Sequence, residues 1–163
     1  MRRTRRIPVW LLALPLVLAA GEAQARLEMG TLRLGLGLGL RSSSTGLTFA
    51  ASGTFGVFAL KGLEFGVDTH FQAGGDSPTL GILAGYGRYV VLPDYPVTPY
   101  ALAGGGHLFV EGPDAWVVSA GGGVLYFFHE MLGLDIGVEY RWFFFPEETL
   151  GGFDVVLGLG LFF

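Results

Sequence analysis

The chain has 163 residues, of which 51% are hydrophobic, and it carries a formal net charge of −4 and no cysteine. This length allows one domain with one modest core or one small barrel. The lack of cysteine excludes a disulfide framework and a thiolate metal site. The 28 glycines and 14 phenylalanines are an unusual pairing, because glycine weakens a strand and needs a packing reason to occur inside one.

Residues 1–25 have the features of a cleaved export signal. Arginines at positions 2, 3, 5 and 6 precede an apolar stretch over 9–20, and Ala23-Gln24-Ala25 supplies a small-x-small cleavage pattern. The apolar stretch is shorter than the about 20 residues that a spanning helix needs. Cleavage after Ala25 removes those four arginines and Glu22, which leaves 6 Lys+Arg against 13 Asp+Glu, a formal charge of −7. So acidic a chain is a poor partner for nucleic acid.

From residue 28 onward, apolar side chains alternate with polar or small ones, which is the period of a β-strand. The last segment shows the pattern most clearly, because Phe153 and every second residue up to Phe163 are apolar, while Asp154 and glycines occupy most of the other face. Clusters of polar residues, glycine and proline separate such segments. Each segment is long enough to cross a membrane as a tilted strand, which needs about 9–11 residues. The sequence therefore predicts eight strands, at 28–40, 47–59, 63–72, 79–91, 100–110, 116–128, 133–142 and 152–163.

Two of these strands alternate less regularly than the others. In 79–91 we expect the apolar, outward face to carry Leu80, Ile82, Ala84, Tyr86 and Val90. Arg88 interrupts that face and is expected to lie at a membrane boundary. In 100–110 we expect the same face to carry Tyr100, Leu102, Leu108 and Val110.

Alternation alone does not say which face is inside, and a soluble lipocalin-like barrel would turn the apolar face inward. The other face is mostly glycine and alanine, which makes a poor aqueous surface but suits the narrow interior of an eight-stranded barrel. We therefore expect lipid outside. Charges turned inward must pair, because isolated buried charges are costly. The predicted interior polar network consists of Arg33, Glu64, Asp68, His70, Asp135, Glu139, Arg141 and Asp154.

Aromatic residues near the strand ends are expected to face outward and to form girdles at the two membrane interfaces. They are Phe49, Phe71, Tyr86, Tyr100, Trp116, Tyr126, Tyr140, Trp142, Phe153 and Phe163.

The export signal, the eight alternating strands and the aromatic last residue resemble small outer-membrane β-barrels of the OmpA-like type. The resemblance covers 26–163 and implies an all-β fold, an eight-stranded antiparallel up-and-down transmembrane barrel in the bacterial outer membrane. It also implies two partners, outer-membrane lipid and the barrel-assembly machinery. In that class the machinery reads a C-terminal signal, which Phe153, Leu157, Leu159, Leu161 and Phe163 match here. The physiological task and the oligomeric state stay open, and we expect a structural or envelope-associated role with a filled interior.

Some eight-stranded barrels modify lipid A, so the histidines are candidate catalytic residues. A deacylase of that kind has His and Ser two residues apart, whereas His70 is followed by Gln72 and His107 by Phe109. His70 with Asp76 and Ser77 is a loose match to the palmitoyltransferase set, but Asp-Ser-Pro is ordinary turn chemistry. The histidines have no metal spacing. The sequence therefore predicts no catalysis, no cofactor and no metal. Alternatives are a barrel that binds a small apolar ligand and, less favoured, a lipid A-modifying enzyme.

Overall fold

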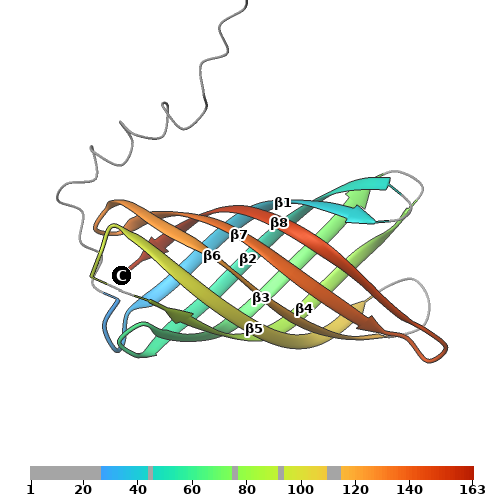
Figure 1. The fold of residues 1–163 in the computed structure, drawn as a ribbon, viewed down its shortest axis with the longest axis horizontal. Helices are drawn as coiled ribbons and strands as arrows, with labels where there is room; N and C mark the ends of the chain where they lie inside the picture. Colours follow the sequence, from blue (N-terminus) through green and yellow to red (C-terminus); the bar gives the residue numbers. More distant parts are fainter. Residues whose placement is uncertain (1–26, 44–45, 75–76, 92–93, 110–114) are drawn as a thin grey trace, which may run out of the picture.

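The computed structural model describes residues 27–43, 46–74, 77–91, 94–109 and 115–163, and this part of the chain forms one closed barrel (Figure 1). Its strands are β1 (Leu32–Ser43), β2 (Gly46–Leu60), β3 (Leu63–Gly74), β4 (Ser77–Val90), β5 (Val97–Phe109), β6 (Ala115–His129), β7 (Leu132–Phe144) and β8 (Thr149–Phe162). The predicted eight-stranded antiparallel barrel is confirmed. The predicted signal peptide at 1–25 lies outside the described residues. No helix in the described ranges is long and apolar enough to cross a membrane.

Strands adjacent in sequence pair antiparallel, and the sheet closes where β1 pairs with β8. In that seam Leu36 lies opposite Leu159 and Arg33 opposite Phe162. We call the end of the barrel that holds Phe163 the terminal end, on the left of Figure 1, and the opposite end the loop end. At the terminal end β2 turns into β3 through Lys61 and Gly62, and Gly62 has a φ of +76°, which glycine adopts without strain.

Large apolar side chains cover the outside of the barrel, as alternation predicts. Leu36 and Leu38 on β1 are 77% and 72% exposed, and Leu157 and Leu159 on β8 continue this surface across the seam. Eight of the ten aromatic residues expected in the girdles point outward as predicted. Phe49, Phe71, Trp116, Tyr126, Tyr140, Trp142, Phe153 and Phe163 occupy the same face of their strands as these leucines.

Two apolar clusters fill the barrel near its ends. The terminal-end cluster consists of Leu27, Phe58, Val90, Tyr100, Leu125, Phe127 and Phe162, with Leu102 packed against it. The loop-end cluster consists of Ile82, Leu108, Ala115, Val117 and Phe143, with Ala84 and Phe145 packed against it. The core members of both clusters are buried, and the buried charged side chains of the described residues lie in the middle of the barrel.

The predicted faces of 79–91 and 100–110 were wrong. Ile82, Tyr100 and Leu108 are buried, and Tyr86 and Arg88 also point into the barrel, so the even-numbered residues over 82–90 and 98–108 face inward. The side chain of Leu80 and the whole of Val110 lie outside the described part of the chain. Arg88 is therefore an interior residue and does not lie at a membrane boundary. Outward positions on these strands are held largely by small residues, Gly85, Gly87, Ala101, Ala103 and Gly105. Because apolar residues of the two clusters face inward here, hydrophobicity indicated the wrong side.

Glycines on neighbouring strands make the space that the two inward tyrosines occupy. A Cβ on Gly66 would lie 2.7 Å from the hydroxyl oxygen of Tyr86, and one on Gly123 would lie 2.6 Å from that of Tyr100. Real Cβ atoms do not approach other atoms so closely, so a side chain at either glycine would displace a tyrosine. The high glycine content of the interior face thus has the packing reason that the composition requires.

Candidate functional site

A layer of ionised side chains lies between the two apolar clusters and is the candidate functional site. It contains all eight residues of the predicted interior network, and the structure adds Arg88, Tyr86 and Tyr100 to them. The layer divides into two clusters, which we name the Arg33–Arg88 cluster and the Arg141–His70 cluster. The first comprises Arg33, Glu64, Arg88 and Asp135 with the two tyrosines, and the second Asp68, His70, Glu139, Arg141 and Asp154.

The Arg33–Arg88 cluster joins two arginines to two carboxylates from four different strands. Arg33 on β1 donates from Nη2 to Asp135 Oδ2 over 2.6 Å, and its Nη1 lies 3.5 Å from Glu64 Oε1. Arg88 on β4 places its Nη2 3.2 Å from the same Asp135 oxygen and its Nη1 3.6 Å from Glu64 Oε2. Within this cluster the two positive and two negative charges balance, as burial of charge requires.

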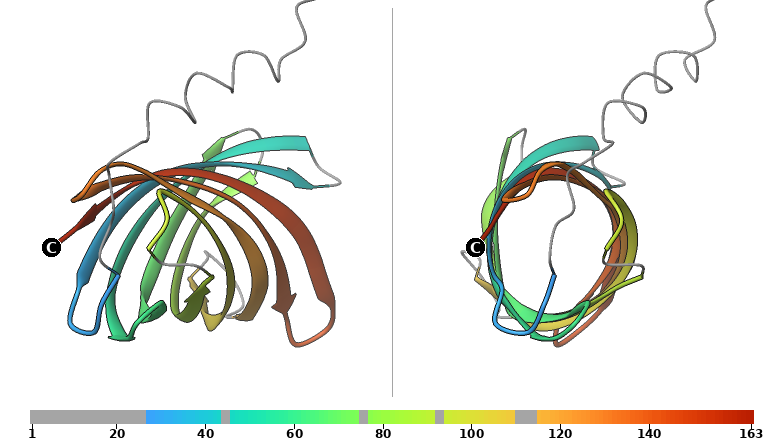
Figure 2. Two further views of the ribbon diagram at one scale, coloured as in Figure 1. Left: turned by 60° about the vertical axis from the view of Figure 1, so that its left-hand side comes forward. Right: turned by 90° about the vertical axis from the view of Figure 1, so that its left-hand side faces the viewer.

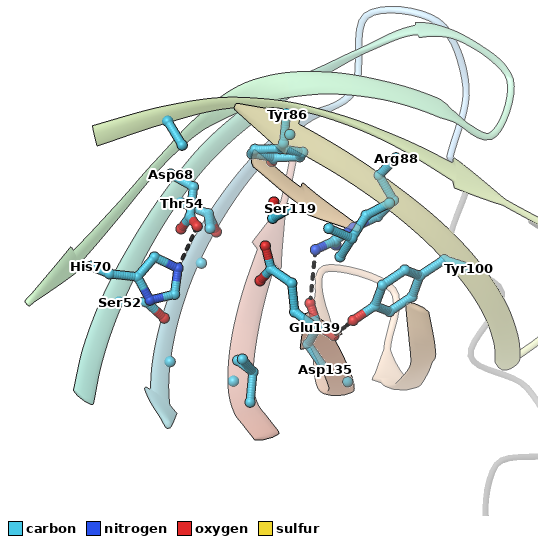
Figure 3. A pocket seen from close by; sticks show the side chains of 18 of the residues that line it. Ser52, Thr54, Asp68, His70, Tyr86, Arg88, Tyr100, Ser119, Asp135 and Glu139 are labelled. Carbon is cyan, nitrogen blue, oxygen red and sulfur yellow. Dashed lines mark hydrogen bonds and ion pairs between the residues drawn. The ribbon is translucent and has the colours of Figure 1, made fainter. Parts of the chain in front are cut away.

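The two inward tyrosines complete this cluster. Tyr86 donates its hydroxyl hydrogen to Glu64 Oε1 over 2.5 Å, and Tyr100 donates to Asp135 Oδ1 over 2.7 Å. The guanidinium of Arg88 also lies 4.3 Å from the centre of the Tyr100 ring, close enough for a cation–π interaction. Asp135 therefore binds both arginines and a tyrosine, and Figure 3 shows its contacts with Arg88 and Tyr100. Glu64 accepts a hydrogen bond from Tyr86 and lies at ion-pair distance from both arginines.

The Arg141–His70 cluster has a different charge balance. Arg141 on β7 donates from Nη2 to Glu139 Oε2 over 2.8 Å and places its Nε 3.2 Å from Asp154 Oδ2 on β8. The Nε2 of His70 on β3 contacts both Asp68 and the guanidinium of Arg141. Three carboxylates thus share one arginine and one histidine among the contacts of this cluster.

A small cavity of about 60 Å³ lies between the Arg33–Arg88 cluster and the Arg141–His70 cluster. Its lining includes the side chains of Ser52, Thr54, Asp68, Ser119 and Glu139 (Figure 3). Such a volume holds about four water molecules. The Thr54 hydroxyl and Asp68 Oδ1 have no hydrogen-bond partner among the described residues, so water in this cavity would complete their bonding.

The geometry of His70 does not resemble an accessible catalytic site. His70 is 8% exposed and faces the barrel interior, where Ser52 lies opposite it in the β2–β3 register. No hydrogen bond between these two side chains occurs in the described part of the chain, although Asp68 contacts His70 as the acid of a triad would. The palmitoyltransferase match included Asp76, which lies outside the described residues, and Ser77, whose side chain is not described. His107 faces outward and packs its ring against Phe109 and Trp116.

Metal ligation has no geometric support among the described residues, where no three His, Cys, Asp or Glu side chains are arranged to hold an ion. The residues predicted as an assembly signal, Phe153, Leu157, Leu159, Leu161 and Phe163, all lie on the outward face of the barrel's last segment.

Sequence reasoning missed Arg88 and the two tyrosines, although one signal could have found them. Arg88 lies directly opposite Glu64 in the β3–β4 register, so an inward Glu64 requires an inward Arg88. An arginine in a lipid-facing wall is unfavourable, whereas the same residue opposite a buried glutamate is paired. A prediction that gave the charge of Arg88 more weight than the hydrophobic alternation would have placed the correct face of β4 inside the barrel.

A closed antiparallel barrel with an apolar outer wall and an ionic interior is the architecture of a transmembrane β-barrel. Solved structures of this class are similar to the chain. Neisserial surface protein A matches with a TM-score of 0.64 at 20% identity, over 82% of this chain and 96% of that one. The N-terminal β-barrel domain of Pseudomonas aeruginosa OprF matches with a TM-score of 0.64 at 16% identity, over 83% and 98%.

A third similar structure is the Yersinia pestis outer membrane protein Ail in a phospholipid bilayer nanodisc, with a TM-score of 0.55 at 13% identity, over 82% of this chain and 99% of that one. Comparisons with protein-family models and with curated proteins give no match. At these identities the likeness shows the fold, and the chain therefore has the fold of eight-stranded outer-membrane β-barrels.

Proposed function

We propose that the protein is an integral protein of the bacterial outer membrane with a structural role in the cell envelope. In this proposal residues 1–25 direct export and are removed, and residues 26–163 form the barrel. The observation that carries the proposal is the arrangement of polarity: an ionic layer and two apolar clusters fill the interior, inside a wall whose outer face is apolar.

The exposed apolar side chains of the outer wall suit contact with lipid. Leu36, Phe55, Val67, Ile136 and Leu159 are each at least about half exposed, and they come from five different strands. A soluble protein rarely exposes a continuous apolar patch beyond a few hundred square ångströms. Closure through β1 and β8 supports the same conclusion, because it leaves no unpaired strand edge in the hydrocarbon.

The interior supports a closed barrel and not a solute channel. Apolar side chains pack inside the barrel toward both ends, and the cavity at the ionic layer has room for about four water molecules. An eight-stranded barrel is in general just wide enough for its own side chains. The same cavity is too small for an apolar ligand, so the structure does not favour the lipocalin-like alternative. His70 is enclosed in the interior, which does not favour catalysis on lipid A.

Two partners follow from the proposal. Outer-membrane lipid contacts the apolar wall, and the barrel-assembly machinery reads the outward residues of the last segment, Phe153, Leu157, Leu159, Leu161 and Phe163, during insertion. Their common outward face supports a role as an exposed signal.

Cell fractionation combined with gel electrophoresis tests the proposal. We expect the protein in the outer-membrane fraction, without residues 1–25, and we expect unheated and heated samples to migrate differently, since a membrane barrel stays folded in detergent until heated. Recovery as a soluble periplasmic protein would overturn the proposal. Reconstituted into planar bilayers, the protein should show no steady ion conductance.

A further inference from the structure

An apolar groove of about 1110 Å³ lies on the outer wall of the barrel, where β7, β8, β1, β2 and β3 adjoin. The described residues that line it are all uncharged. The wall is lowest on β2, because Ala51 and Gly53 carry at most a methyl group, whereas Phe55 is the next outward residue of that strand. The volume is similar to that of large ligand sites, which reach about 1,000 Å³.

Two leucines of β1 stand beside the low part of the groove. Leu36 lies opposite Gly53, and Leu38 lies opposite Ala51, in the β1–β2 register. They are 77% and 72% exposed, whereas Leu159, on the other side of Leu36, is 55% exposed. The small residues on β2 leave one flank of each leucine uncovered. A molecule that fills the groove would therefore gain dispersion contacts with these flanks.

The polar atoms of the groove are bonded within the wall or turned away from it. Thr69 lies opposite Gly53 on β3 and donates its hydroxyl hydrogen to the Gly53 carbonyl over 3.1 Å. Ser52 and Thr54 also belong to the lining, but they alternate with the outward residues of β2, and their side chains line the interior cavity. The surface that the groove offers to an occupant is therefore apolar.

The shape of the groove suits a flexible chain better than a second copy of the barrel. The end-on view in Figure 2 shows a closed, rounded cross-section, so the outer wall is convex. Two convex walls meet along a narrow strip, and a second barrel would rest on Leu36 and Leu38 without reaching Gly53. A stable interface buries about 800 Å² on each partner, which a narrow strip does not provide. A flexible hydrocarbon chain can enter between the leucines.

We propose that this groove binds one acyl chain of a membrane phospholipid. Its lining reaches from Leu132 and Leu161, close to the terminal end, to Leu38 and Ala51, near the middle of their strands. A phospholipid whose headgroup lies at the terminal end can therefore place its chain along the groove. The uncharged lining selects the chain and not the headgroup. The inference rests on the lipid contact of the proposed function and assigns one held chain to one part of the wall.

Native mass spectrometry in detergent tests the site, because detergent removes weakly held lipid while a chain bound in the groove is retained. The protein is purified from membranes in detergent and incubated with dipalmitoylphosphatidylcholine. We expect one phospholipid molecule to stay bound to each barrel. Folding of every variant is checked by the heat-dependent gel shift.

Gly53→Leu fills the groove at its lowest part, and Gly105→Leu is the matched control, because Gly105 is an outward glycine of β5 outside the groove. A Cβ would lie 3.2 Å from the Thr69 hydroxyl oxygen at position 53 and 3.5 Å from the Val117 carbonyl oxygen at position 105, so both positions accept a side chain with little shift. We expect Gly53→Leu to lower phospholipid retention about tenfold, because the leucine occupies the place of the chain. Gly105→Leu should leave retention unchanged.

If Gly53→Leu does not fold, Ala51→Leu serves instead, because position 51 already carries a Cβ. A diacylglycerol and an anionic phospholipid with the same acyl chains should be retained as well as the zwitterionic one. Retention of the anionic lipid alone would overturn the inference in favour of a headgroup site. A dimer that Gly53→Leu abolishes would overturn it in favour of a second copy.

Two further results would overturn the acyl-chain site: no phospholipid retained by the native chain, or equal loss of retention in Gly53→Leu and Gly105→Leu. The groove and the proposed function fail differently. Recovery as a soluble periplasmic protein contradicts the proposed function. An outer-membrane protein that retains no phospholipid contradicts only the groove.

Discussion

Replacement of Arg88 by methionine tests the ionic layer and the orientation of β4 together. Methionine keeps most of the volume and removes the charge. Glu64 and Asp135 would then share Arg33 alone, because the contacts of Arg88 at 3.6 Å and 3.2 Å are lost. Removing one partner from a buried ionic group destabilises a protein by about 3–5 kcal/mol. We therefore expect the free energy of unfolding to fall by about that amount.

The opposite orientation of β4 predicts a different sign for the change in the free energy of unfolding. If Arg88 faced lipid, its removal would be neutral or stabilising, since a cation in a lipid-facing wall costs about 0–4 kcal/mol depending on its depth. The measurement is denaturant unfolding in lipid vesicles, followed by the fluorescence of Trp116 and Trp142 on the outer wall. A stability equal to or above that of the native protein would refute the reasoning.

Two further variants sharpen this test. Lys61→Met removes the exposed pair between Lys61 Nζ and Asp94 Oδ2 at 2.7 Å, with both side chains more than half exposed. Such pairs contribute at most about 1 kcal/mol, so this matched control should change stability little. Adding Glu64→Gln to Arg88→Met removes one uncompensated carboxylate, and we expect it to recover about 1 kcal/mol or more. Additive losses would show that the two side chains do not interact.

Other variants test the wall and the packing. Leu159→Arg places a charge in the outer wall and should lower the free energy of unfolding in lipid by about 2–4 kcal/mol. Met29→Arg is the control and should change it little, because Met29 is exposed and lies outside the strands. Equal effects of the two variants would contradict lipid contact at Leu159. Gly137→Ala should destabilise by about 1–3 kcal/mol, because the new Cβ meets the Tyr100 hydroxyl. Tyr100→Phe should relieve part of that loss in a double-mutant cycle, and a coupling of zero would contradict the packing.

The regular strands were predictable because one physical rule determines them. In β1 and β8 every outward residue from Leu34 to Leu38 and from Phe153 to Leu161 is large and apolar where the inward ones are mostly glycine. Alternation and the narrowness of an eight-stranded barrel then determine the face without knowledge of the neighbours. The interior network followed from the same faces.

The faces of β4 and β5 were not predictable from hydrophobicity, since both faces carry apolar or small residues. Ile82 and Leu108 are inward because the ends of the barrel are filled by apolar clusters, and that filling depends on partners from β6 and β7. The inward tyrosines depend on glycines of other strands, such as Gly66 and Gly123. Such contacts are tertiary, so they are not encoded in the local pattern of one strand.

The position of Leu27 was missed for a related reason. Residues 28–31 are compatible with alternation, but the left-handed Gly30 and the bond from Gly62 to Leu27 turn the chain into the mouth. Nothing in the local sequence distinguishes this turn from one more stretch of strand.

A spin-label scan along β8 in lipid vesicles tests most directly whether the outer wall meets lipid and the interior is closed. Single cysteines would be placed at 155, 156, 157, 159 and 161, in a chain that otherwise has none. Gly158 and Gly160 are left out, because a Cβ there would lie 3.1 Å from the Leu36 carbonyl oxygen and 2.8 Å from the Phe162 ring. The collision rates of each label with oxygen and with a water-soluble nickel complex would be measured. We predict a period of two, with labels at odd positions such as Leu157 and Leu159 accessible to oxygen and shielded from nickel. The label at Val156, which points into the barrel, should be shielded from both. Nickel access at the odd positions would contradict the account.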